Sequence, residues 1–344
     1  MPLIQGVLSP LLQSSILLAG VVAAGSMRIG TLTGMTGSSV ASTRLPVIMA
    51  VLRLALAGEA LRRINRALNA IASNSWRLKA SPGWHWPDEI AVVTGGCGGI
   101  GLGVALKLAE HGVRVAVLDI KDAPESLQES SRIRYYKCDI SDPSAVADVA
   151  NLIREELGHP SILINNAGIC GFRTIMDITE SYIHRIFGVN AIAHFLTTKQ
   201  FLPHMIQSDK GHIITVASLA SYITLARAAD YSATKAAALA FHEALRSELK
   251  HFYKAPNVMT TSVHTNWVDT PILDGLEDFF KKEGIRPLSS DYVAEKIVNH
   301  ILSNTGGRLI LPEKDAMAAT LPGWPMWMQE LTRDFYGRRA TRVM

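Results

Sequence analysis

The segment YSATKAAALAF carries two groups that could transfer a proton, the phenol of Tyr231 and the ammonium of Lys235. They stand four residues apart in an alanine-rich stretch that favours a helix, so both lie on one helical face. A cation about 4 Å from a phenolate, at an effective dielectric constant near 20, attracts it by roughly 4 kcal/mol. That attraction corresponds to about three pKa units before desolvation, so we expect Lys235 to lower the pKa of Tyr231. The pair predicts a general acid or base.

A second chemical signal is the glycine-rich stretch TGGCGGIG. It lies between a segment typical of a buried strand, IAVVTGG, and one typical of an amphipathic helix, GIGLGVALKLAEHG. Glycine permits positive φ and lets backbone N–H groups approach a pyrophosphate at the helix N-terminus. We therefore expect a dinucleotide to be held by Thr94, Gly95, Gly99, Ile100 and Gly101.

The next expected strand ends in an acid that selects the cofactor. Asp119 follows Gly101 by 18 residues and closes the segment VRVAVLD. A carboxylate in this place accepts hydrogen bonds from the adenosine ribose hydroxyls and repels a 2′-phosphate. Position 120 is Ile rather than Arg, so the sequence favours NAD over NADP.

Strand-like and helix-like segments alternate from Trp86 onward, which predicts parallel βαβ units. The expected fold class is α/β, a Rossmann-type doubly wound parallel sheet of about seven strands. We expect three regions: an apolar and amphipathic helical arm over 1–85, the Rossmann-type domain over 86–315, and an aromatic and basic cap or tail over 316–344.

The N-terminal arm differs from the rest of the chain in charge and hydropathy. Residues 1–90 contain eight Lys or Arg and three acids, which gives them a net charge of +5. Because the whole chain has a net charge of +4, the remaining residues have a net charge of −1. Residues 7–24 have no charge and could span about 27 Å as a helix, which suits either a membrane anchor or a peripheral apolar arm. Residues 30–45 resemble a linker. From Pro46 onward the pattern predicts a helix lying on a membrane surface or on the protein itself.

Several classes of function have no support in the sequence. The three cysteines, Cys97, Cys138 and Cys170, lack metal-ligand spacing, and the chain has no HExxH, Cys/His cluster or Walker-type loop. We expect no metal site and free thiols in a reducing compartment. No basic, aromatic-studded surface indicates a nucleic-acid partner.

Motifs in a fixed order now identify a family resemblance. TGxxxGIG at 94–101, Asp139 in CDIS, NNAG at 165–168, Asn190 in GVNA, Ser218 and YxxxK at 231–235 resemble a classical short-chain dehydrogenase/reductase. The strings NAIAHFLTTKQFLPHM and GHIITVAS are similar to its membrane-associated branch of retinol dehydrogenases and 17β-hydroxysteroid dehydrogenases of lipid droplets and endoplasmic reticulum.

This resemblance implies roles for particular residues. Tyr231 would be the base in oxidation and the acid in reduction, Ser218 would bind the substrate oxygen, and Asn190 would hold a water that relays protons to Lys235. Lys235 would also bind the nicotinamide ribose. The implied cofactor-binding residues are Thr94, Gly95, Gly99, Ile100, Gly101, Asp119, Asp139, Ile140, Asn166, Ala167, Gly168, Tyr231, Lys235 and Thr270.

The loop after the sixth expected strand departs from the family pattern. Thr265 and Asn266 stand where the family usually has Pro-Gly, and the loss of proline removes a constraint on φ. We expect a less rigid loop there. Of three histidines near the motifs, His194 and His212 are expected to form structural hydrogen bonds, whereas His264 lies near the expected site.

The expected function is hydride transfer between NAD, or less favourably NADP, and a hydroxyl or carbonyl of a lipophilic substrate such as a retinoid, steroid or long-chain alcohol. The alternatives are a ketoreductase or dehydrogenase of a secondary-metabolite pathway and a non-catalytic, dinucleotide-sensing membrane scaffold. The resemblance also implies a homo-oligomer attached through the arm to the endoplasmic reticulum or a lipid droplet, with the catalytic domain on the cytosolic side.

Overall fold

A computed structural model describes residues 39–341. The chain divides into two compact units, residues 1–79 and residues 80–344. The apolar segment 7–24, predicted as an anchor or peripheral arm, lies outside the described residues.

The described part of the first unit is dominated by one helix, α2 (Ser39–Ser73). It begins within the stretch 30–45 that we predicted as linker, so Pro46 lies inside the helix rather than at its start. Glu59 pairs with Arg62 and Arg63 at 2.7 Å each, one helical turn away. Within residues 39–341, no helix combines the length and the apolar character needed to cross a membrane.

The second unit is built on a seven-stranded sheet in the order β3-β2-β1-β4-β5-β6-β9, and every pair is parallel. This arrangement confirms the predicted fold class. The strands are β1 (Ile90–Thr94), β2 (Arg114–Asp119), β3 (Ile133–Lys137), β4 (Ile162–Asn165), β5 (Gly211–Val216), β6 (Val258–Thr265) and β9 (Gly307–Leu311). A short parallel pair, β7 (Val268–Asp269) with β8 (Leu288–Ser289), follows β6.

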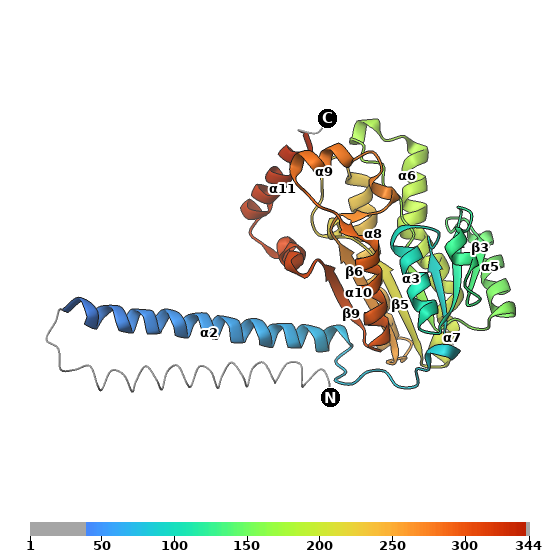
Figure 1. The fold of residues 1–344 in the computed structure, drawn as a ribbon, viewed down its shortest axis with the longest axis horizontal. Helices are drawn as coiled ribbons and strands as arrows, with labels where there is room; N and C mark the ends of the chain where they lie inside the picture. Colours follow the sequence, from blue (N-terminus) through green and yellow to red (C-terminus); the bar gives the residue numbers. More distant parts are fainter. Residues whose placement is uncertain (1–38, 342–344) are drawn as a thin grey trace. The chain divides into compact units, whose positions relative to one another are not determined.

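Helices cover both faces of the sheet (Figure 1), as its buried strands require. One core packs α3 and α10 on the sheet, and the other packs α5, α7 and α8. The helices are α3 (Gly99–Glu110), α4 (Glu125–Gln128), α5 (Pro143–Glu156), α6 (Glu180–Phe187), α7 (Ala193–Gln207), α8 (Ala229–His251), α9 (Glu277–Glu283), α10 (Ser290–Leu302) and α11 (Met326–Thr341). Shorter helical segments are η1 (Trp86–Asp88), η2 (Ile175–Asp177), η3 (Gly188–Ile192), η4 (Leu219–Ser221), η5 (Pro271–Leu273) and η6 (Glu313–Gly323).

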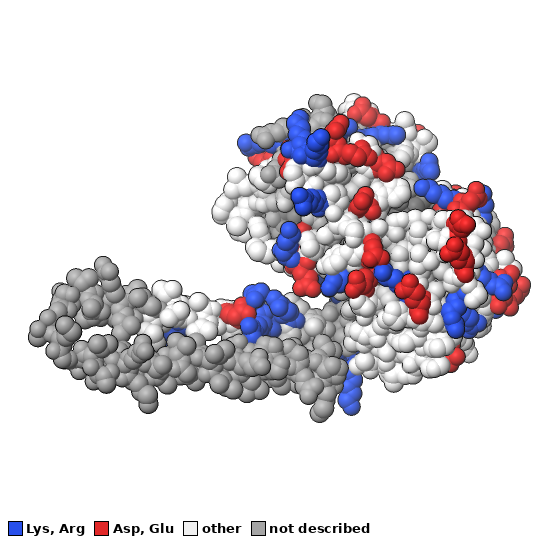
Figure 2. Space-filling view, in the orientation of Figure 1, with Lys and Arg blue, Asp and Glu red and all other residues white. Residues whose placement is uncertain are grey.

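The strand order reverses between β1 and β4, because the chain runs outward from β1 to β3 and then crosses back to β4. In such sheets a crevice opens at the carboxyl ends of the strands at this switch point. The residues that follow β1, β2, β4, β5 and β6 therefore meet at one edge. On the face shown in Figure 2, acidic and basic side chains of the second unit are interspersed, without a large patch of one sign.

Candidate active site

A cavity of about 1320 Å³ opens at this edge of the sheet. It is lined by Gly95, Gly99, Ile100, Asp119, Asp139, Ile140, Asn166, Ala167, Gly168, Ser218, Tyr231, Lys235 and Thr270. Three predicted site residues lie behind the lining rather than on it: Thr94, Gly101 and Asn190. One cavity thus joins the glycine turn to the phenol and the ammonium.

The turn between β1 and α3 requires glycine for steric reasons. A Cβ at Gly101 would lie 2.2 Å from the carbonyl oxygen of Gly95, and one at Gly95 would lie 2.8 Å from Cα of Ala167. Gly95 also has φ of +67°. The turn ends at the N-terminus of α3, where no side chain caps the free N–H groups. This cradle fits the pyrophosphate of a dinucleotide.

The hydroxyl of Thr94 and the side-chain amide of Asn166 join the turn to the residues that follow β4 by hydrogen bonds. Thr94 Oγ1 accepts hydrogen bonds from the backbone N–H groups of Asn166 at 3.0 Å and Ala167 at 3.1 Å. Asn166 Nδ2 in turn donates to the carbonyl oxygens of Thr94 at 3.0 Å and Gly95 at 3.2 Å. Thr94 is therefore a supporting residue of the cradle.

Asp119 lies at the end of β2 and lines the cavity, as predicted. Its Oδ2 accepts a hydrogen bond from the backbone N–H of Cys97 at 2.9 Å, and Oδ1 accepts one from Lys121 N–H at 3.0 Å. The carboxylate is thus held at the rim of the glycine turn. Its remaining lone pairs can accept ribose hydroxyls.

Lys235 is 3% exposed, and its Nζ donates a hydrogen bond to the carbonyl oxygen of Val216 at 2.9 Å. The same Nζ lies 5.6 Å from the ring centroid of Tyr231. Burial lowers the pKa of Lys235 to about 8. The ammonium therefore lies near the phenol ring and donates a hydrogen bond to a backbone carbonyl.

The pKa of Tyr231 changes in the direction opposite to our expectation. Burial raises it above its ordinary value, the Cys170 thiol adds to the rise, and a hydrogen bond with Ser218 opposes it. Desolvation of the phenolate is the largest cause, and the Lys235 ammonium, 5.6 Å from the ring centroid, does not reverse it. The phenol is accordingly protonated at neutral pH.

Ser218 is held where β5 ends and η4 begins. Its Oγ accepts a hydrogen bond from the N–H of Ala220 at 3.1 Å and donates to the carbonyl oxygen of Thr265 at 3.3 Å. Ser218 and Tyr231 both line the cavity. This pair can bind one oxygen atom of a substrate.

Asn190 is buried in η3, a π-helical turn between α6 and α7. Its side-chain amide exchanges two hydrogen bonds with the backbone of Ile169 at 2.8 Å and 2.9 Å. Nδ2 also donates to Thr234 Oγ1 at 3.1 Å. The side chain thus ties the loop after β4 to the catalytic helix α8, and its role with a relay water stays a prediction.

The loop after β6 is secured without the proline. Asn266 Nδ2 donates to Asp315 Oδ2 at 2.7 Å, and its backbone N–H donates to Leu311 at 2.8 Å. Asn266 Oδ1 accepts from the N–H of Trp267 at 2.8 Å. The loss of rigidity that we expected is therefore offset by hydrogen bonds to β9 and η6.

Thr270 lies over the glycine turn, 2.9 Å from where a Cβ of Gly99 would stand.

The sequence motifs did not reveal an aromatic wall of the cavity. The ring of Phe172 lies 5.9 Å from that of Trp267, which packs edge-on against Phe280 at 5.5 Å. Arg227 donates two hydrogen bonds, at 3.2 Å and 3.1 Å, to the carbonyl oxygen of Phe172. Both Phe172 and Arg227 have positive φ, +47° and +63°, a conformation that costs energy for such residues. In the sequence, the aromatic residues that follow β6, such as Trp267 and Phe280, could have indicated this wall.

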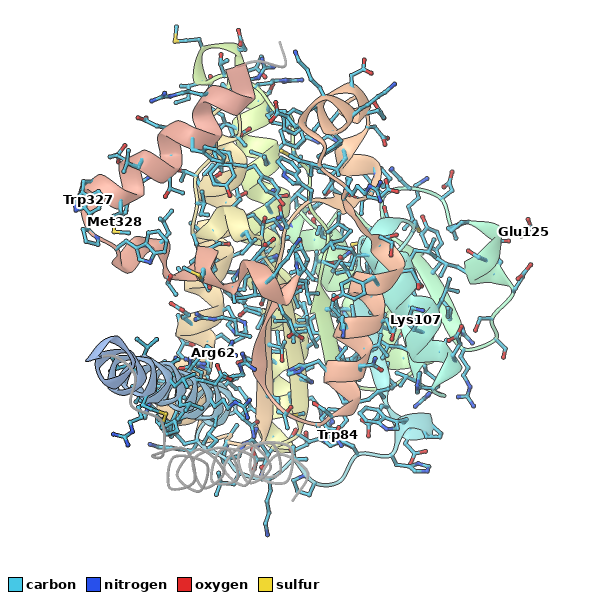
Figure 3. The ribbon with its side chains drawn as sticks, turned by 60° about the vertical axis from the view of Figure 1, so that its left-hand side comes forward. Arg62, Trp84, Lys107, Glu125, Trp327 and Met328 are labelled. Atoms are coloured by element: carbon cyan, nitrogen blue, oxygen red, sulfur yellow. The ribbon has the colours of Figure 1, made fainter. Side chains whose placement is uncertain are left out.

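The C-terminal region contributes to the lining of the cavity. Leu321 and Trp324 from the η6 region and Tyr336 from α11 line it. Figure 3 shows Trp327 on the outer side of α11, and this side chain is 65% exposed. The cap or tail over 316–344 stays a prediction, and these three of its described residues line the cavity.

The other predicted histidines differ in their surroundings. His212 Nε2 lies 2.8 Å from Thr261 Oγ1, which confirms a structural hydrogen bond. Within the described residues, neither ring nitrogen of His194 has a hydrogen-bond partner, so that prediction is wrong. His194 packs 5.7 Å from the ring of Phe241, and burial lowers its pKa to about 3.

Residues 89–279 match the family model described as short chain dehydrogenase. Dehydrogenase RED2 of Cochliobolus heterostrophus is 37% identical over 204 residues, 57% of this chain and 77% of that protein. Epidermal retinol dehydrogenase 2 of Homo sapiens is 34% identical over 233 residues, 65% and 74% of the two chains. Retinol dehydrogenase 10-B of Danio rerio is 32% identical over 245 residues, which cover 63% of this chain and 72% of that protein.

Among solved structures, the ligand-free aldohexose dehydrogenase of Thermoplasma acidophilum superposes with a TM-score of 0.56. It is 22% identical and is matched over 66% of this chain and 93% of its own. At this identity the likeness extends to the fold alone.

Proposed function

The chain belongs to the short-chain dehydrogenase/reductase family and resembles its retinol dehydrogenase branch, and from this premise we propose that it interconverts a lipophilic alcohol and its carbonyl compound with NAD. The single observation that carries the proposal is the shared cavity. It joins a glycine cradle, the Ser218–Tyr231 pair and an aromatic wall.

The residues fit a nicotinamide dinucleotide, which would supply or accept the hydride. Gly95 and Gly101 allow the tight turn before α3, Gly98 leaves open space beside the cavity, and Asp119 presents a carboxylate at the rim. This carboxylate supports NAD, because a 2′-phosphate beside it would be repelled. Lys235 and Thr270 would hold the nicotinamide half.

The chain's own residues move one proton per turnover. In reduction, the half-buried Tyr231 phenol, which lines the cavity, donates its proton to the substrate oxygen, and Ser218 Oγ holds that oxygen. In oxidation, Tyr231 must first lose its proton, and the nearby Lys235 ammonium stabilises the resulting phenolate. Because its pKa is raised, Tyr231 is protonated at neutral pH and can act directly as the acid in reduction. To act as the base in oxidation, its phenolate must be stabilised by Lys235.

The proposed substrate class rests on the cavity wall. Phe172, Trp267 and Leu321 contribute apolar side chains to the cavity that Ser218 also lines, which suits a retinoid, a steroid or a long-chain alcohol. A membrane-attached enzyme would meet such substrates where they are dissolved. We therefore include attachment of residues 1–85 to the endoplasmic reticulum or a lipid droplet in the proposal, supported by the exposed leucines of α2.

A homo-oligomer also belongs to the proposal. Three exposed apolar side chains lie on α6, on η3 and at the start of α7, namely Ile183, Ile192 and Phe195. Burial of such a face against a second copy would remove apolar area from water.

The test is NADH formation by the detergent-purified full chain with retinoid, steroid, long-chain and small polar alcohols. We expect turnover of apolar alcohols that disappears in Tyr231→Phe, while the variant still binds NAD. Turnover of small polar alcohols alone would contradict the substrate class. Preference for NADPH with ketones would favour a biosynthetic ketoreductase, and NAD binding without any turnover would favour the sensing role.

A further inference from the structure

His264 is the penultimate residue of β6 and is fully buried, yet it contacts the catalytic serine. Its Nδ1 lies 3.2 Å from the backbone carbonyl oxygen of Ser218, and its Nε2 lies 3.3 Å from the hydroxyl of Tyr222. The rings of His264 and Tyr222 are 4.9 Å apart. His264 does not line the cavity, so it lies behind Ser218 rather than beside a substrate.

These partners determine which ring nitrogen carries the proton. A carbonyl oxygen can only accept, so Nδ1 must carry the hydrogen and donate it to Ser218. A neutral imidazole has one donor and one acceptor, so Nε2 accepts and the Tyr222 hydroxyl donates. Burial lowers the pKa of His264 to about 4, with its bond to Ser218 opposing and Arg308 and Lys235 reinforcing the change. The ring is thus neutral at physiological pH.

Consecutive residues of β6 hold Ser218 at two points. His264 holds the carbonyl group, and the Thr265 carbonyl oxygen receives the Ser218 Oγ–H at 3.3 Å. The Ser218 carbonyl oxygen also accepts the N–H of Ser221 at 3.0 Å. Both of its lone pairs are therefore used, and the backbone that carries Oγ is fixed.

The arrangement continues towards the surface through charged groups on two neighbouring elements. Arg308 of β9 lies over the Tyr222 ring, 5.9 Å from its centroid, and pairs with Glu243 of α8 at 3.2 Å. The tyrosine is thereby held where its hydroxyl reaches His264.

We propose that His264, oriented by Tyr222, is a positioning residue that aims Ser218 Oγ at the substrate oxygen. The role rests on the proposed function, because it requires that Ser218 binds the reacting oxygen. His264 itself touches neither substrate nor cofactor. A small displacement of a catalytic group can cost about 100-fold in rate, so this contact matters for kcat.

Two isosteric variants separate the two contacts of the ring. In His264→Asn the amide nitrogen lies near the place of Nδ1 and can still donate to Ser218, whereas in His264→Gln it lies near the place of Nε2. We expect His264→Asn to keep most of kcat and His264→Gln to lose about 10- to 100-fold, with unchanged NAD affinity in both. Tyr222→Phe should lose less, because the Nδ1 contact remains. Equal kcat values for the Asn and Gln variants at matched thermal stability would overturn the proposal.

NMR of the histidine ring nitrogens provides a readout that needs no turnover. The signal absent from His264→Asn identifies His264, and we expect its proton on Nδ1 in the wild type. A proton on Nε2 would overturn the proposal even in a fully active enzyme. If the wild type converts no alcohol or ketone, the proposed function fails, whereas the position of this proton still decides whether His264 holds Ser218.

Discussion

The proposed preference for NAD rests on a single side chain at the rim of the cavity. Asp119 receives two backbone N–H groups, so its carboxylate is held in place, where it would repel a 2′-phosphate. Asp122, three residues on, is 90% exposed and pairs with Lys137 at 3.0 Å outside the lining. Asp119 thus lines the cavity and Asp122 does not, although the two acids are close in sequence.

Asp119→Asn should lower the preference for NAD over NADP by at least about tenfold, since tenfold corresponds to about 1.4 kcal/mol of lost repulsion. Asparagine keeps one acceptor oxygen, so the turn remains supported. The ratio of kcat/KM for the two cofactors measures the effect, with Asp122→Asn as the matched control. An unchanged ratio in Asp119→Asn would show that the carboxylate does not select the cofactor.

The pKa values of Tyr231 and Lys235 predict opposite pH dependence for the two directions. Burial keeps Tyr231 protonated through neutral pH, so carbonyl reduction should stay constant there and fall only in alkali. Alcohol oxidation needs the phenolate and should rise with pH. The rise should flatten above about 8, where Lys235 begins to lose its proton and its stabilising charge. Initial rates in both directions across the pH range test this, and an oxidation rate independent of pH would contradict it.

Among the elements, the turn between β1 and α3 offers a matched pair of glycines. A Cβ at Gly101 would clash at 2.2 Å with the Gly95 carbonyl oxygen, whereas one at Gly98 meets nothing within 4 Å. We expect Gly101→Ala to destabilise the fold by about 1–3 kcal/mol, the usual cost of overpacking. Gly98→Ala should change the thermal midpoint much less. Equal midpoints for the two variants would show that the turn relaxes freely.

The loop after β4 and the loop before α8 are joined by Arg227. Because its two hydrogen bonds hold Phe172 against Trp267, Arg227→Lys should loosen the aromatic wall. We expect a several-fold higher KM for apolar alcohols with little change in NAD affinity. Arg134→Lys, at a surface ion pair with Glu156, is the control. A parallel loss of NAD affinity would mean that the whole site has moved.

These elements also show what the sequence can and cannot predict. Strands such as β1 and β4 were predictable because each is an apolar run followed by glycine or polar residues. The motif residues meet because parallel strands end at one edge. The contact of Arg227 with Phe172 joins residues 55 positions apart, which no local pattern encodes. The direction of the Tyr231 pKa was missed because it depends on desolvation by the completed fold. Likewise, the start of α2 at Ser39 overrides a local glycine, serine and threonine signal.

At the scale of the whole molecule, the two units differ in what they expose. The second unit buries two cores, one on each face of its sheet, with side chains such as Leu108, Ile164 and Phe201 almost fully buried. In contrast, α2 exposes leucines at a spacing of seven residues: Leu54 at 73%, Leu61 at 66% and Leu68 at 50%. A spacing of seven keeps these side chains on one helical face, with a drift of about 20° per repeat. Arg62, Arg63 and Arg66 lie in the same stretch, a pattern typical of a helix at an anionic lipid surface.

The full chain should therefore bind vesicles that contain anionic lipid, and salt should weaken the binding because the basic charge is screened. Replacing Leu54, Leu61 and Leu68 together by serine should weaken partitioning at least about 100-fold, since each buried leucine contributes about 1.5–3 kcal/mol. Sedimentation with vesicles measures this, and serine at Leu152, Ile175 and Met176, three exposed apolar residues of the second unit, provides the control. If the α2 variant binds vesicles as well as the wild type but loses self-association, the leucine face contacts a second copy instead of lipid. Activity on a water-soluble alcohol should be unchanged in the α2 variant, because the residues that line the cavity all belong to the second unit.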